Sequence, residues 1–362
     1  MKVERQGWLK GMVFYIFSSL VVFFTTCQAV DLRFANYFPA PSMQSQVCEE
    51  IIRDIEQATQ GKVKFRYFPG GSLLTAPRMY DGVVEGIADI GFSNIEYTFG
   101  RFKETELLVL PHGFPTVWVS VHVANDFLAT YQPKEWKDVH VLALHTCPLY
   151  NIITVKKPVT KLEDLKGLTL RAIGYVAKTL AALGGTPRSI PMAEAYDALT
   201  KGVIDGLMSP IETLETWKFA EIAKYVTEIW PVGQVNVFYI VMNKKTWESL
   251  PPDVKKVFSE YPFVEKLAKM WNEVDIRGRK VGKEKGLQFI TLSPTEAARW
   301  KAKAREVIDE YIRNMEREGI SKNELENRLA FIKERIDYWT KRQRELGIKS
   351  STGPEDLLVK LD

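Results

Sequence analysis

A ten-residue pattern occurs twice in this chain. YDGVVEGIAD begins at Tyr80 and YDALTKGVID begins at Tyr196, and both place glycine six and aspartate nine residues after the tyrosine. Each copy follows a Gly-Gly pair and leads into a short apolar segment with a polar end, GFSN at 91–94 and GLMS at 206–209. A match in both sequence and setting predicts two similar lobes built from one kind of unit.

The segments around these copies alternate between strand and helix patterns. DLRFA at 31–35 and KVKFRYF at 62–68 alternate as strands do, and residues 42–58 between them have the spacing of an amphipathic helix. Strands that alternate with helices of this length are typical of α/β units with a largely parallel sheet. Ligands bind outside the carboxyl ends of strands in such sheets, so the two lobes are expected to share a cleft there.

Two further segments extend this organisation. VNVFYIVMN at 235–243 is a strong apolar strand and a candidate crossover between the lobes. From 293 to about 346 the chain is highly charged and helical, and it starts with a capping box over SPTE, with proline at the first helical position. We expect this region to pack on the protein and to expose a solvated face, with a partner-binding helix as the alternative.

The N-terminus has the pattern of a secretory signal peptide. Three basic residues within the first ten precede an uncharged apolar run over 12–24, and Ala29 follows a short polar stretch. The run is shorter than the roughly 20 apolar residues of a bilayer span, so we expect cleavage near Ala29 and export, with an uncleaved anchor as the alternative. Without residues 1–29, 46 basic and 44 acidic residues remain. A net charge this small gives no sign of a nucleic-acid partner.

Patterns typical of enzymes and metal sites are missing from the sequence. None of the four histidines has a metal-ligand spacing, and no GxSxG, P-loop or GxGxxG motif occurs. Asp89 and Asp205 end the two copies of the repeat and are expected to be structural. Cys48 and Cys147 are too few for a disulfide scaffold, and their bonding stays open. These patterns favour a protein that is not an enzyme and needs no cofactor or metal, although catalytic residues far apart in sequence would escape such a search.

Arg171 is the residue that the patterns single out for ligand binding. It lies near the end of the apolar segment 168–173, before a helix expected from about Tyr175. A helix start presents unpaired N–H groups and a partial positive charge. A guanidinium beside it suits a carboxylate or a phosphate, because arginine can bind a carboxylate through two parallel hydrogen bonds. The alternative is a structural salt bridge with a carboxylate such as Asp164 or Glu194.

Four segments, in this order, make the chain resemble the DctP-like substrate-binding proteins of tripartite ATP-independent periplasmic (TRAP) transporters. They are TQGKVKFRYFPGGSL, VVEGIADIGF, KKPVTKLEDLKGLTLRAIG and GGTPRSIPMAEAYDALTKGVIDGLMSPIETLETWKF, and the resemblance covers roughly residues 31–260. It implies a two-lobed periplasmic-binding-protein-like α/β fold with hinge crossovers and a long helical C-terminal region. It also implies a periplasmic protein that delivers an organic acid to a TRAP membrane permease.

The expected boundaries combine the repeat, the crossover and this resemblance. Residues 1–29 would be the signal peptide, 30–150 with about 238–270 the first lobe, 151–237 with about 271–350 the second lobe, and 351–362 a tail.

The resemblance also suggests ligand-binding residues. In the family, the arginine that ends LKGLTLR pairs with the ligand carboxylate, and Arg171 holds that place. The other candidates end strands, lie near hinge crossings or match ligand-lining positions of relatives: Tyr37, Asn94, Tyr150, Met192, Ser209, Asn236 and Phe238. Ser209 replaces an asparagine of many relatives, and it could instead cap a helix over SPIE. Met192 could equally be a core residue, and Trp217 is expected in the core.

Departures from the family pattern narrow the ligand. Several sialic-acid-binding relatives have a second arginine before LEDLKG, whereas this chain has none between Arg101 and Arg171. Met192, Met208 and Phe238 make the expected pocket less polar. We therefore expect a small or moderately apolar monocarboxylate, such as an aromatic or 2-oxo acid, and a dicarboxylate stays open. The alternative functions are a sensor that presents its ligand to a receptor kinase and, less favoured, a periplasmic enzyme acting on organic acids.

Overall fold

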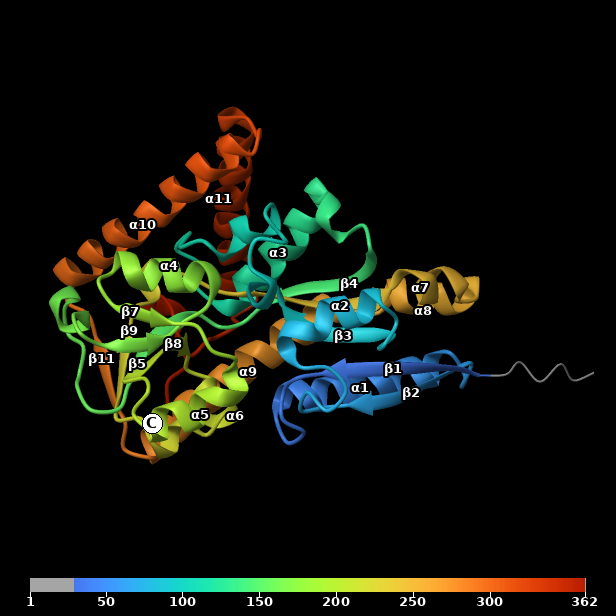
Figure 1. Ribbon diagram of the computed structural model, residues 1–362, viewed down its shortest axis with the longest axis horizontal. Helices are drawn as coiled ribbons and strands as arrows, with labels where there is room; N and C mark the ends of the chain where they lie inside the picture. The colour runs from blue at the N-terminus through green and yellow to red at the C-terminus, as the bar shows by residue number, and fades with distance from the viewer. Residues whose placement is uncertain (1–28, 362) are drawn as a thin grey trace, which may run out of the picture.

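Two mixed β-sheets with helices packed around them form the protein (Figure 1). The computed structural model describes residues 29–361. The strand order is β2-β1-β3-β10-β4 in the first sheet and β11-β9-β5-β8-β6-β7 in the second. We call the parts built on them lobe I and lobe II. The predicted two-lobed α/β fold is confirmed.

The strands of both sheets are short, and most of them are parallel to a neighbour. Lobe I contains β1 (Val30–Asn36), β2 (Val63–Phe68), β3 (Ile90–Asn94), β4 (Val139–Thr146) and β10 (Val237–Asn243). Lobe II contains β5 (Tyr150–Thr154), β6 (Thr169–Arg171), β7 (Thr186–Arg188), β8 (Gly206–Pro210), β9 (Tyr225–Glu228) and β11 (Gln288–Thr291). β1 lies parallel between β2 and β3, as β6 lies between β7 and β8.

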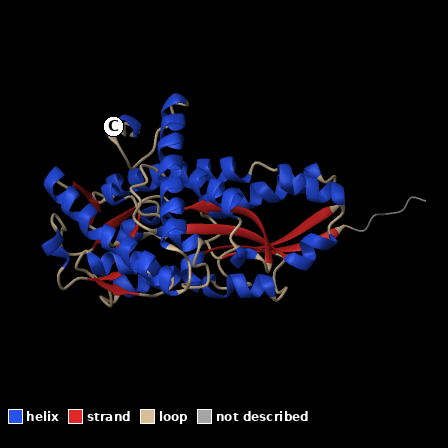
Figure 2. Cartoon of the chain, turned by 90° about the horizontal axis from the view of Figure 1, so that it is seen from above, coloured by secondary structure: helices blue, strands red, loops and turns tan. Residues whose placement is uncertain are grey.

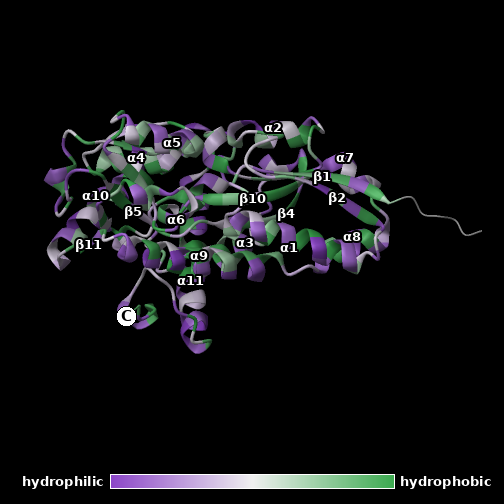
Figure 3. Ribbon diagram, turned by 90° about the horizontal axis from the view of Figure 1, so that it is seen from below, coloured by the Kyte–Doolittle hydropathy of each residue, from purple (hydrophilic) through white to green (hydrophobic). Residues whose placement is uncertain are grey.

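β10 returns the chain from lobe II to lobe I. It inserts between β3 and β4, antiparallel to both, with Phe238 opposite Asn94 on one side and His145 on the other. Every residue of the strand is buried, which explains why the sequence shows a continuous apolar run there rather than an alternation. Figure 3 shows the same contrast, with hydrophobic colouring along β10 and β4 and mixed colouring along α1 and α8.

Helices cover both faces of the first sheet (Figure 2). Those of lobe I are α1 (Met43–Ala58), α2 (Met79–Val84), α3 (Val117–Tyr131), α7 (Lys244–Ser249) and α8 (Pro252–Glu260). Those of lobe II are α4 (Gly174–Ala182), α5 (Met192–Thr200) and the short α6 (Thr213–Thr216). The 22-residue α9 (Phe263–Glu284) packs on α1 and α3 of lobe I and on α6 of lobe II, so it spans both.

The charged C-terminal region forms two long helices, and Ser293 caps the first one as the sequence suggested. α10 (Pro294–Arg317) begins after Ser293, whose side chain accepts a hydrogen bond from the Glu296 amide. α10 packs on α4, whereas α11 (Lys322–Glu345) packs on α3. Residues 271–350, expected in lobe II, thus contact both lobes, and the lobe boundaries stay predictions.

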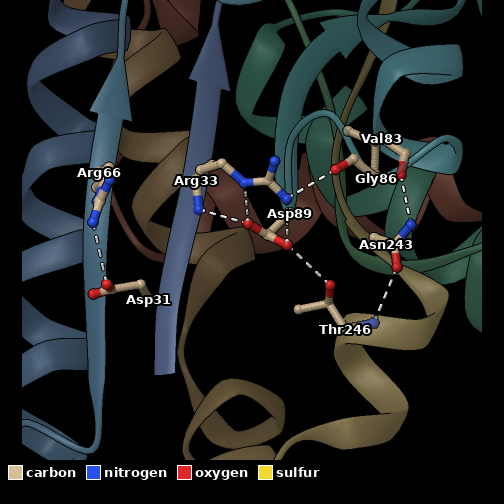
Figure 4. A network of polar contacts seen from close by, with 8 residues as sticks. All are labelled: Asp31, Arg33, Arg66, Val83, Gly86, Asp89, Asn243 and Thr246. Carbon is tan, nitrogen blue, oxygen red and sulfur yellow. Dashed lines mark hydrogen bonds and ion pairs between the residues drawn. The ribbon is translucent and has the colours of Figure 1, made fainter. Parts of the chain in front are cut away.

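The two copies of the repeat form the same structure. Asp89 Oδ2 accepts a hydrogen bond from the Arg33 amide of β1 at 2.8 Å, and Asp205 Oδ2 accepts one from the Thr169 amide of β6 at 2.9 Å. The Asp89 amide donates back to the Arg33 carbonyl, and the Asp205 amide donates back to the Thr169 carbonyl. In lobe I the Arg33 guanidinium and the Thr246 hydroxyl complete the network (Figure 4). Both aspartates are therefore structural, as expected.

The predicted signal peptide, residues 1–29, lies almost wholly outside the described residues. Within those that are described, no helix has the length and apolar character to cross a membrane. Cys48 and Cys147 are both buried free thiols, so this pair forms no disulfide.

Candidate functional site

A narrow cleft lies between the lobes, at the ends of several strands. Seven of the eight predicted site residues line it: Tyr37, Asn94, Tyr150, Arg171, Met192, Asn236 and Phe238. Its lining also includes Phe38, Tyr97, Glu212 and Trp217. The free volume is about 20 Å³, which is room for about one water molecule. The lobes are thus closed, and side chains fill most of the space between them.

Ser209 does not line this cleft, and the predicted helix cap over SPIE is wrong. Ser209 is buried in β8, where it pairs with Asn151 of β5. β8 continues through Pro210, and α6 begins only at Thr213, with Glu212 as its N-cap residue. Among the described residues, the Ser209 hydroxyl has no hydrogen-bond partner. Strand pairing between β5 and β8 has overridden the local capping preference.

Arg171 is buried at the centre of the site, with 1% of its surface exposed. Its Nε donates to the Ile190 carbonyl at 3.0 Å, and its Nη2 lies 3.5 Å from the Tyr97 hydroxyl. Of the two carboxylates that the sequence offered as partners, Asp164 accepts hydrogen bonds from its own turn, and Glu194 is exposed. Across residues 29–361, no carboxylate forms an ion pair with Arg171.

This isolation of Arg171 has an electrostatic consequence. Arginine side chains stay protonated in proteins, and a buried charge without a counter-ion is costly. The backbone carbonyl and the phenol that contact Arg171 are neutral hydrogen-bonding groups. The guanidinium therefore retains the capacity to pair with an anion that enters the cleft.

Aromatic rings form one wall of the cleft. Tyr37 stacks on Phe38 at 4.3 Å between centroids, and Phe38 stacks on Phe238 at 6.0 Å. The Trp217 ring lies nearly parallel to Tyr37, 6.2 Å away with an interplanar angle of 19°. Trp217, expected in the core, lies at its edge: it packs against the core, is half-buried at the end of α6 and also lines the cleft. Flat ring faces of this kind offer apolar contact to a flat ligand.

The polar groups beside this wall are neutral. Asn94 Oδ1 accepts from the Glu96 amide and caps the 3₁₀ helix η2 (Ile95–Thr98). Asn236 Oδ1 is buried without a hydrogen-bond partner among the described residues. Burial raises the pKa of Cys147 and that of Tyr150, which keeps both groups protonated. Because its Oδ1 has no partner, Asn236 can accept a hydrogen bond from a ligand hydroxyl.

Glu96 joins the two lobes beside the cleft. It lies two residues after the end of β3, only 3% of its surface is exposed, and its Oε2 accepts from the Tyr175 amide at 2.6 Å. Burial raises the pKa of Glu96, and the amides of Tyr175 and Val176 oppose that shift. The start of α4, which the sequence predicted to be available to a ligand, is thus occupied by a carboxylate of the protein. Gly174 permits this approach, because its φ is +52° and Glu96 leaves no room for a Cβ atom there.

Tyr97 makes a second contact between the lobes. Its hydroxyl accepts from the Met192 amide at 3.1 Å, at the first residue of α5, and from Arg171. Consecutive residues of η2 thus meet the starts of α4 and α5. The sequence analysis missed both residues, and the only signal for them was their position just after the polar end of β3.

Glu212 is a buried acid on the same cleft. Its Oε2 accepts from Gln44 of α1 at 3.0 Å, and burial raises its pKa to about 8. Its amide donates to Asp275 of α9, whose pKa burial raises to about 6. Among the described residues, no three or more histidine, cysteine or acidic side chains are grouped as a metal site. Glu212 and Asp275 therefore act as hydrogen-bonding acids between α1, α6 and α9.

Two lobes closed over a buried arginine and an aromatic wall define a two-lobed binding protein of the α/β class. Residues 34–314 match the family model of the bacterial extracellular solute-binding proteins, family 7, called DctP. This match covers most of the chain, so the protein belongs to that family.

Solved structures of TRAP solute-binding proteins share the fold. One from Desulfovibrio salexigens is 35% identical with a TM-score of 0.74, over 85% of this chain and 96% of that one. It is an open complex with the C-terminus of a symmetry mate in its ligand site. One from Rhodoferax ferrireducens, with copurified benzoate, is 27% identical with a TM-score of 0.81, over 87% and 99%. A solute-binding protein of Albidiferax ferrireducens is 22% identical over 84% of this chain and 93% of its own length.

Proposed function

We propose that this protein is an extracytoplasmic solute-binding protein that captures an organic monocarboxylate through Arg171 and delivers it to a TRAP permease. The observation that carries the proposal is the buried Arg171 guanidinium, which faces the interlobe cleft without a carboxylate partner among the described residues. Membership of the family supports binding and transport rather than catalysis. In this proposal residues 1–29 direct export to the periplasm.

Binding would begin in an open form, because the closed cleft holds only about 20 Å³. The carboxylate of the acid would pair with Arg171 through two hydrogen bonds. Closure would then expel water, and the pair would strengthen in the drier site. The acid drives closure to the extent that it binds the closed form more tightly than the open one.

The ligand class follows from the surroundings of Arg171. A single buried arginine matches a single carboxylate, and the rings of Tyr37, Phe38 and Phe238 suit an aromatic body. The benzoate held by the Rhodoferax ferrireducens relative supports this class. Asn236 Oδ1 would add selectivity for an acid with a hydroxyl group near the carboxylate.

A thermal-shift screen with Arg171→Ala tests the proposal. Arg188 gives a matched control, because it pairs with Arg171 in register on β7 but is exposed. An acid at a hundred times its Kd stabilises the folded state by about 2.7 kcal/mol, which raises the Tm by roughly 5–10 °C for lobes of this size. Arg188→Ala should keep the shift and Arg171→Ala should lose it. A shift retained in Arg171→Ala, or no shift with any of a broad set of carboxylates on ligand-free protein, would contradict the proposal.

A further inference from the structure

An apolar groove of about 590 Å³ adjoins the cleft. Pro39 and Met43 of lobe I form one side, and Tyr196 of lobe II and Val274 of α9 form the other. Because both lobes contribute, the groove lies at the mouth of the cleft. Trp217 lines the groove and the cleft alike, so its indole separates the two spaces.

Apolar packing alone holds the Trp217 side chain, which lies against both hydrophobic clusters of the protein. Its neighbours are Tyr37 at 6.2 Å and Phe38 at 5.9 Å between centroids, and its indole Nε1 makes no hydrogen bond to any described residue. The backbone at this point ends the four-residue α6, and the next residue, Lys218, has a φ of +60°. The indole can therefore rotate without breaking a polar contact.

For an aromatic acid to fit with the lobes closed as they are here, one wall of the cleft must move. About 20 Å³ beside Arg171 cannot hold an aromatic acid. Tyr37, Phe38 and Phe238 are buried within the core of the protein, so they have no free space behind them. Trp217 has the groove on its other side. Among the four rings of the aromatic wall, it is thus the one with room to turn away.

The rim of the groove indicates what kind of ligand could extend into it. Glu221 accepts from the Tyr196 hydroxyl at 2.9 Å, and Glu215 pairs with Arg277. Lys218 also lines the groove, so its rim carries charges of both signs, while the apolar walls suit an uncharged tail.

We propose that Trp217 is a specificity-determining gate. On binding, its indole turns into the groove, and the apolar tail of the acid follows it, so that cleft and groove form one site for arylalkyl monocarboxylates. This inference rests on the proposed function, since it places the carboxylate of the acid on Arg171.

Calorimetric titration with benzoate, 3-phenylpropanoate and 4-phenylbutanoate tests the gate, because these acids differ only in the spacer between ring and carboxylate. Met43→Trp fills the groove from a residue that does not line the cleft. Gln57→Trp introduces a tryptophan at an exposed position of α1, away from the groove lining, and serves as the control. We expect the wild-type protein to bind the longest acid most tightly. Met43→Trp should weaken that acid about tenfold or more, as each buried CH₂ group contributes several-fold to affinity, and should leave benzoate within about twofold.

Trp217→Ala provides an independent readout. It should weaken benzoate, which loses a ring contact, and should spare 4-phenylbutanoate. The gate proposal would be overturned if Trp217→Ala or Met43→Trp lowered the affinity for all three acids equally. It would also be overturned if the affinity of the wild-type protein did not increase with the length of the spacer. If benzoate binds in an Arg171-dependent manner in those cases, the proposed function survives. If no carboxylate binds the wild-type protein, the proposed function itself fails.

Discussion

The Oε2 atom of Glu96 lies 2.6 Å from the backbone nitrogen of Tyr175, although the two residues belong to different lobes. A carboxylate at a helix start gains both a charge-assisted hydrogen bond and a favourable interaction with the helix dipole. The contact exists only while the lobes are closed. We therefore expect Glu96 to stabilise the closed form of the protein, in addition to the stabilisation that a ligand provides.

Glu96→Gln should shift the protein toward the open form. The amide keeps an acceptor for the Tyr175 N–H group and removes the ionised form, which burial disfavours, so the closed state loses at most about 0.5–2 kcal/mol. Ligand dissociation should become roughly 2- to 30-fold faster. Stopped-flow displacement would measure it, with Glu49→Gln on the exposed face of α1 as the control. An unchanged dissociation rate would show that Glu96 does not hold the lobes together.

Gly174→Ala should destabilise the folded protein more than its backbone strain explains. Gly202 has a similar φ of +68° with open space around it, whereas a Cβ atom at Gly174 would collide with Glu96. Gly202→Ala should therefore cost only the left-handed backbone energy, about 1–2 kcal/mol. Gly174→Ala should cost clearly more, and the double variant Gly174→Ala with Glu96→Ala should recover part of the loss. Chemical unfolding of the wild type, of Gly174→Ala, of Glu96→Ala and of the double variant would measure the coupling, and strictly additive losses would refute it.

Arg171→Met should leave the ligand-free protein about as stable as the wild type, or more so. The change removes a buried charge without a counter-ion, which is unfavourable, and leaves one carbonyl, that of Ile190, without its donor at a cost of about 1–3 kcal/mol. Urea unfolding of ligand-free protein gives the difference. A loss much larger than 3 kcal/mol would mean that Arg171 serves the fold rather than a ligand.

The contribution of Glu212 and Asp275 to the stability of the protein should fall as the pH rises from about 5 to 9. Burial raises the pKa of Glu212 from 4.5 to about 8 and that of Asp275 from 3.8 to about 6. An acid whose pKa rises on folding holds its proton more tightly in the folded state, so its contribution is complete below the unfolded pKa and is lost as the pH passes the folded pKa. Glu212→Gln should make the profile between pH 6 and 9 flatter than that of the wild type, and the slopes from Asp275 and from Glu106, whose pKa burial raises to about 7, should remain. Denaturant unfolding at pH 5, 7 and 9 would test this, and identical profiles for the two proteins would contradict it.

The sequence predicted those parts of the site that lie at strand ends, because local patterns mark them. Arg171 ends β6 and Asn94 ends β3, and the repeat marks the same structural aspartate in each lobe. The sequence could not predict the role of Glu96, because its partner Tyr175 lies 79 residues away and the contact depends on how the lobes close. The alternative of a helix cap at Ser209 was wrong for a related reason: the SPIE pattern is local, while the pairing of β8 with β5 is not.

β10 makes each lobe depend on the complete chain. It lies between β3 and β4 in the first sheet, yet it is encoded after all the strands of lobe II except β11. A chain that stops before residue 237 leaves β3 and β4 with unpaired edges, and unpaired edges invite association with other chains. Neither lobe can therefore be produced by a single cut in the gene. During biosynthesis the first sheet is completed only after most of the polypeptide has been made, which favours a chain that stays unfolded until late in synthesis.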